Sequence, residues 1–119
     1  MVTTELRDEI VWIIVKGELA ARDIRREVGP WLKHKDSFRG FITDLREMTP
    51  IPSPAEQKNM EEWRQQNRSG KPHALLGKPN ALGALTKLYV SFTKAQDTRY
   101  FLKPEAAIAW IMAFQGNTI

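Results

Sequence analysis

The sequence contains no cysteine and only two histidines. The absence of cysteine excludes disulfide bonds, a thiolate nucleophile and any zinc site built on cysteine. His34 lies between two lysines, and His73 begins an apolar segment. Neither histidine has a serine or an aspartate at a spacing typical of a catalytic triad or a metal site. We therefore expect no catalytic residue, no metal site and no bound cofactor.

Long apolar runs are also missing. The longest one near the N-terminus, residues 10–15 (IVWIIV), is far shorter than the roughly 20 residues that a membrane-spanning helix needs. The residues before it are largely polar and mixed in charge, unlike a secretory signal peptide. We expect no membrane insertion and a cytoplasmic location.

Positive charge is present but not concentrated. The net charge is +4, and the basic residues between positions 22 and 39 are interrupted by Asp23, Glu27 and Asp36. This mixture is typical of a solvated helix face, whereas nucleic-acid-binding proteins usually gather their positive charge on one element. Nucleic acid is therefore not an expected partner.

The length and composition predict one globular domain that spans residues 1–119. The chain is 42% hydrophobic and 27% charged. A domain of this size buries roughly two-thirds of the surface of its unfolded chain, which is enough for one core.

Apolar segments of strand length alternate with segments of helical periodicity. We expect strands at residues 3–6, 10–16, 39–45, 72–77 and 97–102 and helices at 20–35, 55–68, 80–94 and from 104 onward. The first two strands are close enough to form a hairpin, and Pro30 should kink or split the first helix. The order ββαβαβαβα predicts an α/β fold. Its mixed sheet has about five strands, the first antiparallel and the rest parallel, with helices on both faces.

The loops that follow parallel strands meet at one sheet edge, where ligands and partners usually bind. The candidate residues at this edge are Asp44, Arg46, Glu47, Ser53, Lys78 and Asn80. The charges at 44–47 are typical of a local ion pair, and the Gly77–Asn80 turn lacks the glycine spacing of a phosphate-binding loop. Ser53 is followed by proline and, three residues on, by Glu56, which indicates a helix cap.

The expected helix at residues 80–94 is too apolar for one sheet-facing stripe. Its apolar candidates are Leu82, Leu85, Leu88, Tyr89, Val90 and Phe92. The extra apolar surface either meets a second copy of the chain or closes over a cavity for an apolar small molecule. We favour a homodimer, because it needs no cavity in so small a domain.

The element order, the Asp44-Leu45 strand end, the helix start at Ser53 and the closing segment 99–110 resemble the SpoIIAA-like (STAS-related) family. The resemblance covers nearly the whole chain and implies a regulatory role. In the anti-sigma-factor antagonists of this group, a phosphorylatable serine lies in an Asp-Ser-Ser/Thr-Gly motif at this helix start. The corresponding residues here are Pro52-Ser53-Pro54-Ala55, so only Ser53 matches. The fold also looks like the lipid-binding half of CRAL-TRIO proteins.

These observations predict a non-enzymatic regulatory or protein-interaction domain without the phosphorylatable motif. An unidentified protein partner would meet the loop edge and the polar helix at residues 55–68. The alternative function is a carrier of an apolar or lipid-like ligand, held beneath the helix at 80–94.

Overall fold

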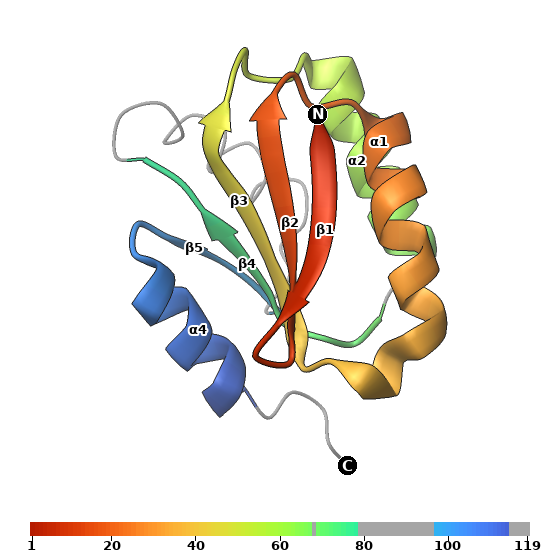
Figure 1. Cartoon of the computed structure of the whole chain (residues 1–119). Helices are drawn as coiled ribbons and strands as arrows, with labels where there is room; N and C mark the ends of the chain where they lie inside the picture. The colour runs from red at the N-terminus through yellow and green to blue at the C-terminus, as the bar shows by residue number, and fades with distance from the viewer. Residues whose placement is uncertain (68, 79–96, 115–119) are drawn as a thin grey trace.

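The computed structural model describes residues 1–67, 69–78 and 97–114. Its sheet contains five strands in the spatial order β1-β2-β3-β4-β5. The strands are β1 (Val2–Arg7), β2 (Ile10–Gly17), β3 (Gly40–Met48), β4 (His73–Leu76) and β5 (Thr98–Phe101). β1 pairs antiparallel with β2, and the remaining neighbours pair parallel, as predicted (Figure 1).

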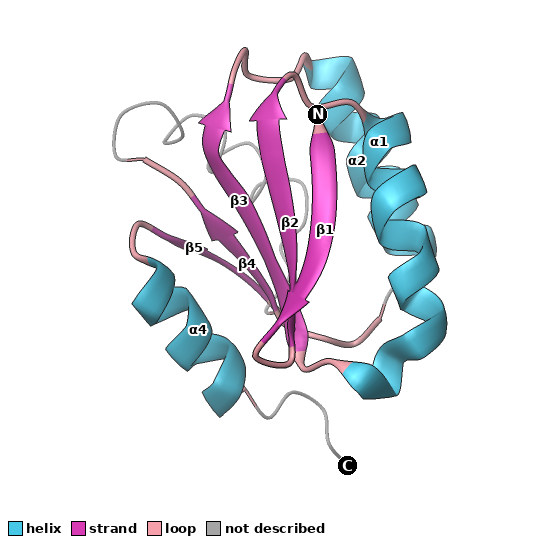
Figure 2. Cartoon of the chain, viewed as in Figure 1, coloured by secondary structure: helices cyan, strands magenta, loops and turns pink. Residues whose placement is uncertain are grey.

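The described helices lie on both faces of this sheet, which confirms the predicted layers (Figure 2). They are α1 (Ala21–Val28), the 3-10 helix η1 (Gly29–Ser37), α2 (Pro54–Gln66) and α4 (Pro104–Ala113). α1, η1 and α2 pack on one face against a core that includes Val11, Ile13 and Val15. α4 packs on the other face against Ile10 and Trp12 through its buried Ala107 and Ile111.

The apolar run in β2 is therefore explained by burial on both faces. Successive strand residues point to opposite faces, so the alternate residues of IVWIIV enter the two cores in turn. The hairpin before it turns at Asp8 and Glu9, whose φ angles are 54° and 66°. This left-handed backbone suits a two-residue turn between twisted strands.

Pro30 splits the first helix, as predicted. α1 ends at Val28, and the chain continues as η1 with Pro30 near its start. A proline has no backbone N–H and its ring clashes with the preceding turn, so an α-helix cannot continue unbroken through it. The Trp31 indole N–H of η1 donates to Thr4 Oγ1 of β1 at 2.9 Å, which ties η1 to the edge of the sheet.

Two expectations about element limits were wrong. β3 continues to Met48, because it contains a bulge in which Leu45 and Arg46 face the single residue Val15 of β2, and pairing then resumes through Lys16↔Glu47 and Gly17↔Met48. The charged residues 44–47 therefore belong to the strand, and the loop begins at Thr49. α2 ends at Gln66 rather than near residue 68.

α2 also buries residues that its sequence does not suggest. Ala55 is exposed, whereas Gln57 and Glu61 are buried at 7% exposure each. The helix thus turns a polar stripe toward the sheet, alongside the partly buried Met60 and Trp63.

Candidate functional site

The predicted charged residues at the carboxyl end of β3 form a local ion pair. The Arg46 guanidinium donates to the Asp44 carboxylate at 2.9 and 2.8 Å, and the Arg46 backbone N–H donates to it at 3.1 Å. Burial raises the pKa of the Asp44 carboxyl, but the hydrogen bonds from Arg46 outweigh this effect and hold the pKa below its usual value. Glu47 and Lys78 are exposed nearby along the edge of the sheet.

Ser53 is the N-cap of α2, as predicted. Its Oγ accepts a hydrogen bond from the Glu56 backbone N–H at 3.1 Å. Glu56 does not reach back to complete a capping box. Its carboxylate instead accepts from the Ala21 backbone N–H at 2.7 Å, at the start of α1. Ala20, the N-cap of α1, has no side-chain acceptor of its own, so Glu56 caps α1 and links the two helices.

Replacing Ser53 by alanine should lower the free energy of unfolding by about 1 kcal/mol, because an orphan N–H of α2 loses its acceptor. Denaturant unfolding measures this change. Ser53→Asp is the matched control, since aspartate retains an acceptor and suits the positive end of the helix dipole. Equal stability of Ser53→Ala and the wild type would show that the cap contributes nothing.

Two exposed apolar side chains lie at the same edge. Ile51, in the loop between β3 and α2, is 45% exposed, and Leu102, directly after β5, is 49% exposed. Both follow the carboxyl end of a parallel strand, so the topology brings them to one edge together with Arg46, Glu47 and Lys78. The sequence did not reveal them, since a single isoleucine among prolines has no periodic pattern.

The remaining predicted residues are Asn80, Leu82, Leu85, Leu88, Tyr89, Val90 and Phe92. They lie outside the described residues. The homodimer and the cavity beneath that helix stay predictions.

A cavity of about 120 Å³, partly open to solvent, lies between the sheet and the layer formed by α1, η1 and α2. Much of its wall is apolar and comes from β2, β3, β4 and these helices: Ile13, Leu19, Ile24, Val28, Leu32, Phe41, Leu45, Pro52, Met60, Trp63 and Leu75. Its polar wall comprises Thr43, Gln57, Arg64, Asn67, Ser69, Lys71, His73, Asp97 and Thr98. Sequence analysis selected none of these residues.

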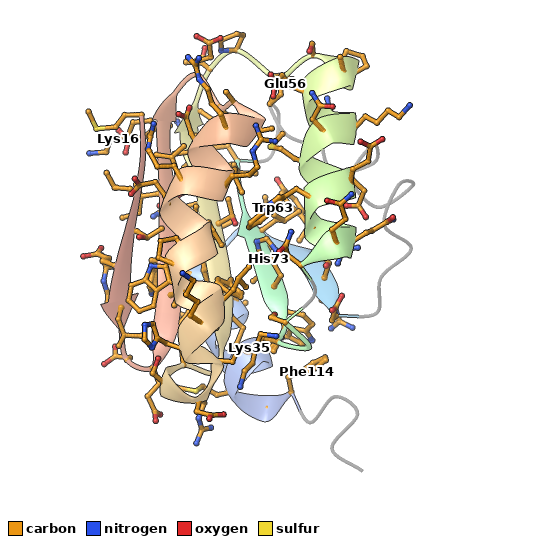
Figure 3. The ribbon with its side chains drawn as sticks, turned by 90° about the vertical axis from the view of Figure 1, so that its right-hand side faces the viewer. Lys16, Lys35, Glu56, Trp63, His73 and Phe114 are labelled. Carbon is orange, nitrogen blue, oxygen red and sulfur yellow. The ribbon has the colours of Figure 1, made fainter. Side chains whose placement is uncertain are left out.

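Figure 3 shows two of the lining side chains, Trp63 from α2 and His73 from β4, in the space between the helices and the sheet. The His73 Nε2 atom lies 2.5 Å from the Thr43 hydroxyl oxygen, across the β3–β4 pair. Burial, with a smaller effect from the Arg64 charge, lowers the pKa of His73 to about 4, while Asp97 opposes this shift. The imidazole is therefore neutral at pH 7.

The side-chain amide of Gln57 is the second notable polar group of this wall. Its Nε2 donates to the Pro52 carbonyl at 2.8 Å. A carbonyl only accepts hydrogen bonds, so this contact fixes the amide orientation and turns Oε1 the other way. Among the described residues, Gln57 Oε1 is the buried side-chain atom without a hydrogen-bond partner.

The charge of Arg64 is compensated within α2. Its guanidinium donates to the Glu61 carboxylate at 2.8 and 3.0 Å, and both side chains are largely buried. Among the described lining residues, the other charged ones, Lys71 and Asp97, have opposite signs. The described part of the polar wall thus carries balanced charges.

Within the described ranges, no group of three or more histidine and acidic residues is arranged to hold a metal ion. None of the described helices has the length and apolar character required to cross a membrane.

No family model and no curated protein matches the sequence. Solved structures do match. An anti-sigma factor antagonist from Mycobacterium paratuberculosis has a TM-score of 0.71 and 14% identity, over 94% of this chain and 93% of that chain. An uncharacterised protein from Shewanella loihica with a SpoIIAA-like fold has a TM-score of 0.65 and 13% identity, over 93% of this chain and 92% of that chain.

A third match is the anti-sigma factor antagonist SpoIIAA in its unphosphorylated form, with a TM-score of 0.65 and 15% identity, over 96% of this chain and all of that one. At such identities the matches establish the fold alone. They agree with the strand order, the antiparallel first strand and the helices on both faces. This chain has the SpoIIAA-like fold.

Proposed function

We propose that the chain is a non-enzymatic regulatory domain that binds a protein partner through the carboxyl edge of its sheet. The observation that carries this proposal is that two exposed apolar side chains, Ile51 and Leu102, both follow strands that end at that edge. An apolar centre with a polar rim is typical of a protein-binding surface.

The shared fold also supports a regulatory, protein-binding role. Two of the matching structures are anti-sigma factor antagonists, and each aligns with this chain over more than nine-tenths of its length. By analogy, a protein of the anti-sigma factor type is the first partner to test.

Control by phosphorylation is not part of this proposal. Only Ser53 matches the phosphorylatable motif of the resembling family, and its hydroxyl already serves as the cap of α2. Pro52 and Pro54 flank it on both sides, and Pro54 is the first residue of α2.

Replacing Ile51 by glutamate should reduce recovery of a co-purifying partner at least tenfold, because a charge would then enter the apolar centre of the contact. The experiment purifies tagged chain from its own cells and quantifies the bound protein by mass spectrometry. Leu6→Glu is the matched control: Leu6 is 47% exposed, close to the 45% of Ile51, but lies at the opposite end of the sheet beside the β1–β2 hairpin.

A partner retained by Leu6→Glu and lost by Ile51→Glu would support the proposal. Equal retention by both variants, or a chain that purifies alone, would refute it.

A second candidate function, the carriage of a small apolar ligand, is favoured by the cavity between the sheet and α1, η1 and α2. Its wall combines a large apolar part with several polar side chains, which suits a small-molecule site. The two functions use different surfaces and are compatible.

A further inference from the structure

We infer that the outer face of α4 binds the same face of a second copy of this chain. The two helices run antiparallel and are related by a two-fold axis beside Ala109. This contact differs from the homodimer that the sequence predicts through the helix at residues 80–94. It is also separate from the proposed protein-binding edge and from the cavity.

The apolar character of α4 on its solvent side is the first argument. Its exposed residues are all apolar except Glu105: Glu105, Ala106, Ala109, Met112 and Ala113. The other α-helices expose polar residues instead. The exposed residues of α1 are arginines, and α2 beyond its first turn exposes Lys58, Asn59, Glu62, Gln65 and Gln66. A helix that is apolar on all sides is normally buried, so the outer face of α4 should be covered.

The described part of the chain leaves this face uncovered. α4 packs on β3, β4 and β5, and Figure 1 shows no other labelled helix on its side of the sheet. Ala107 and Ile111 are buried against the sheet, and at 3.6 residues per turn Ala109 lies on the opposite side of the helix. Glu105 and Met112 share that side. The small side chain at its centre allows a second helix to approach closely.

The charges at the two ends of the face favour a second copy as the occupant. Glu105, in the first turn of α4, takes part in none of the ion pairs between described residues. At the other end, the exposed Arg39 guanidinium donates to Met112 Sδ at 3.8 Å. Its ion pair with Glu9 is long, at 3.4 Å, and joins two exposed side chains. The face therefore has a negative charge at one end and a positive charge at the other.

An antiparallel pair brings these opposite charges together. With the axis beside Ala109, Glu105 of each copy lies next to Met112 of the other, within reach of the Arg39 that contacts it. The N-terminal end of each α4 also meets the C-terminal end of the other, which suits the helix dipoles. A parallel pair would instead place the two Glu105 carboxylates side by side, and like charges repel.

Sedimentation velocity of the full chain tests this contact. A single pair of helices is a small interface, so we expect a dissociation constant on the order of 10 to 100 µM. Ala109→Glu should weaken the dimer at least tenfold, because two like charges would meet at the axis. Ala55→Glu is the matched control, since it makes the same substitution at an exposed alanine of α2, and it should leave the dimer unchanged.

Charge reversal tests the antiparallel arrangement itself. Glu105→Arg and Arg39→Glu should each weaken the dimer about fivefold, because each change places like charges together at two symmetry-related contacts. The double variant exchanges the two charges and should recover most of the wild-type affinity. A residue that acts only on the folding of its own chain would not give this recovery.

Three results would overturn the inference. In the first, the wild type remains a monomer at about 1 mM, ten times the weakest dissociation constant expected. In the second, the dimer persists in Ala109→Glu, which would place the contact on another surface. In the third, the double variant dimerises no better than the single variants, which would exclude the antiparallel pair. None of these results bears on whether the edge at Ile51 retains a protein partner.

Discussion

Gly40→Ala should lower the free energy of unfolding by about 1 to 3 kcal/mol, which is the usual cost of overpacking a core. Gly40 begins β3 beneath α4, and an added Cβ would lie 2.8 Å from Ile111 Cγ2 and 2.8 Å from the Pro72 carbonyl oxygen. The isoleucine methyl can move, but the Pro72 carbonyl is backbone and accepts a hydrogen bond from Phe41 N–H at 2.9 Å. The added methyl must therefore displace α4 or strain the link between β3 and the chain entering β4.

Gly29→Ala is the control for this prediction. The backbone of Gly29 is helical, with φ and ψ both −48°, and an added Cβ meets nothing within 4 Å. Residue 29 precedes Pro30, whose ring disfavours a Cβ on a preceding residue in the α region. Alanine there should therefore lower stability, but by less than alanine at residue 40, because no tertiary contact opposes the added Cβ. Chemical denaturation of both variants gives the comparison. Equal stability of the two variants would show that α4 does not pack closely over Gly40.

Lowering the pH from 7 to 5 should cost about 2 kcal/mol of stability through His73. The pKa of its imidazole is about 4 in the fold, against about 6.5 in the unfolded chain. Protonation therefore favours the unfolded state. The stabilisation is fully present above pH 6.5 and is lost progressively as the pH falls toward 4.

The measurement is the unfolding free energy at several pH values between 7 and 5, above the range where most carboxylates titrate. His73→Gln should flatten the dependence, and the slope is the readout because the substitution itself alters stability. His34→Gln, the same substitution at an exposed position of η1, is the matched control. If the unfolding free energy of His73→Gln still falls with pH as steeply as that of the wild type, other groups cause the pH dependence.

Local physical chemistry explains what the sequence could predict. The β-branched run of β2, the split at Pro30 and the cap at Ser53 each depend on residues that are neighbours in the chain. Their preferences act before any tertiary contact forms, so pattern analysis recovers them. The alternation of strands and helices along the chain then predicts the layer arrangement.

What the sequence could not predict depends on partners that are distant in the chain. The Glu56 carboxylate was expected to cap its own helix, but it caps α1 at Ala21, 35 residues away. A helical pattern assigns polar residues to the solvent-facing side, so Gln57 and Glu61 are expected to be exposed. They are buried because Pro52 and Arg64 satisfy most of their hydrogen-bonding groups. Part of the cavity wall consists of buried polar residues of this kind, so the cavity could not be predicted from the sequence.

Photo-crosslinking in cells tests the central claim, a protein-binding carboxyl edge, most directly. A photoreactive phenylalanine analogue is placed at Ile51, at Leu102 or at Leu6, three apolar positions with exposures between 45% and 49%. We expect Ile51 and Leu102 to give the same crosslinked partner and Leu6 to give none. A partner crosslinked at Leu6, or no adduct at either edge position, would contradict the account.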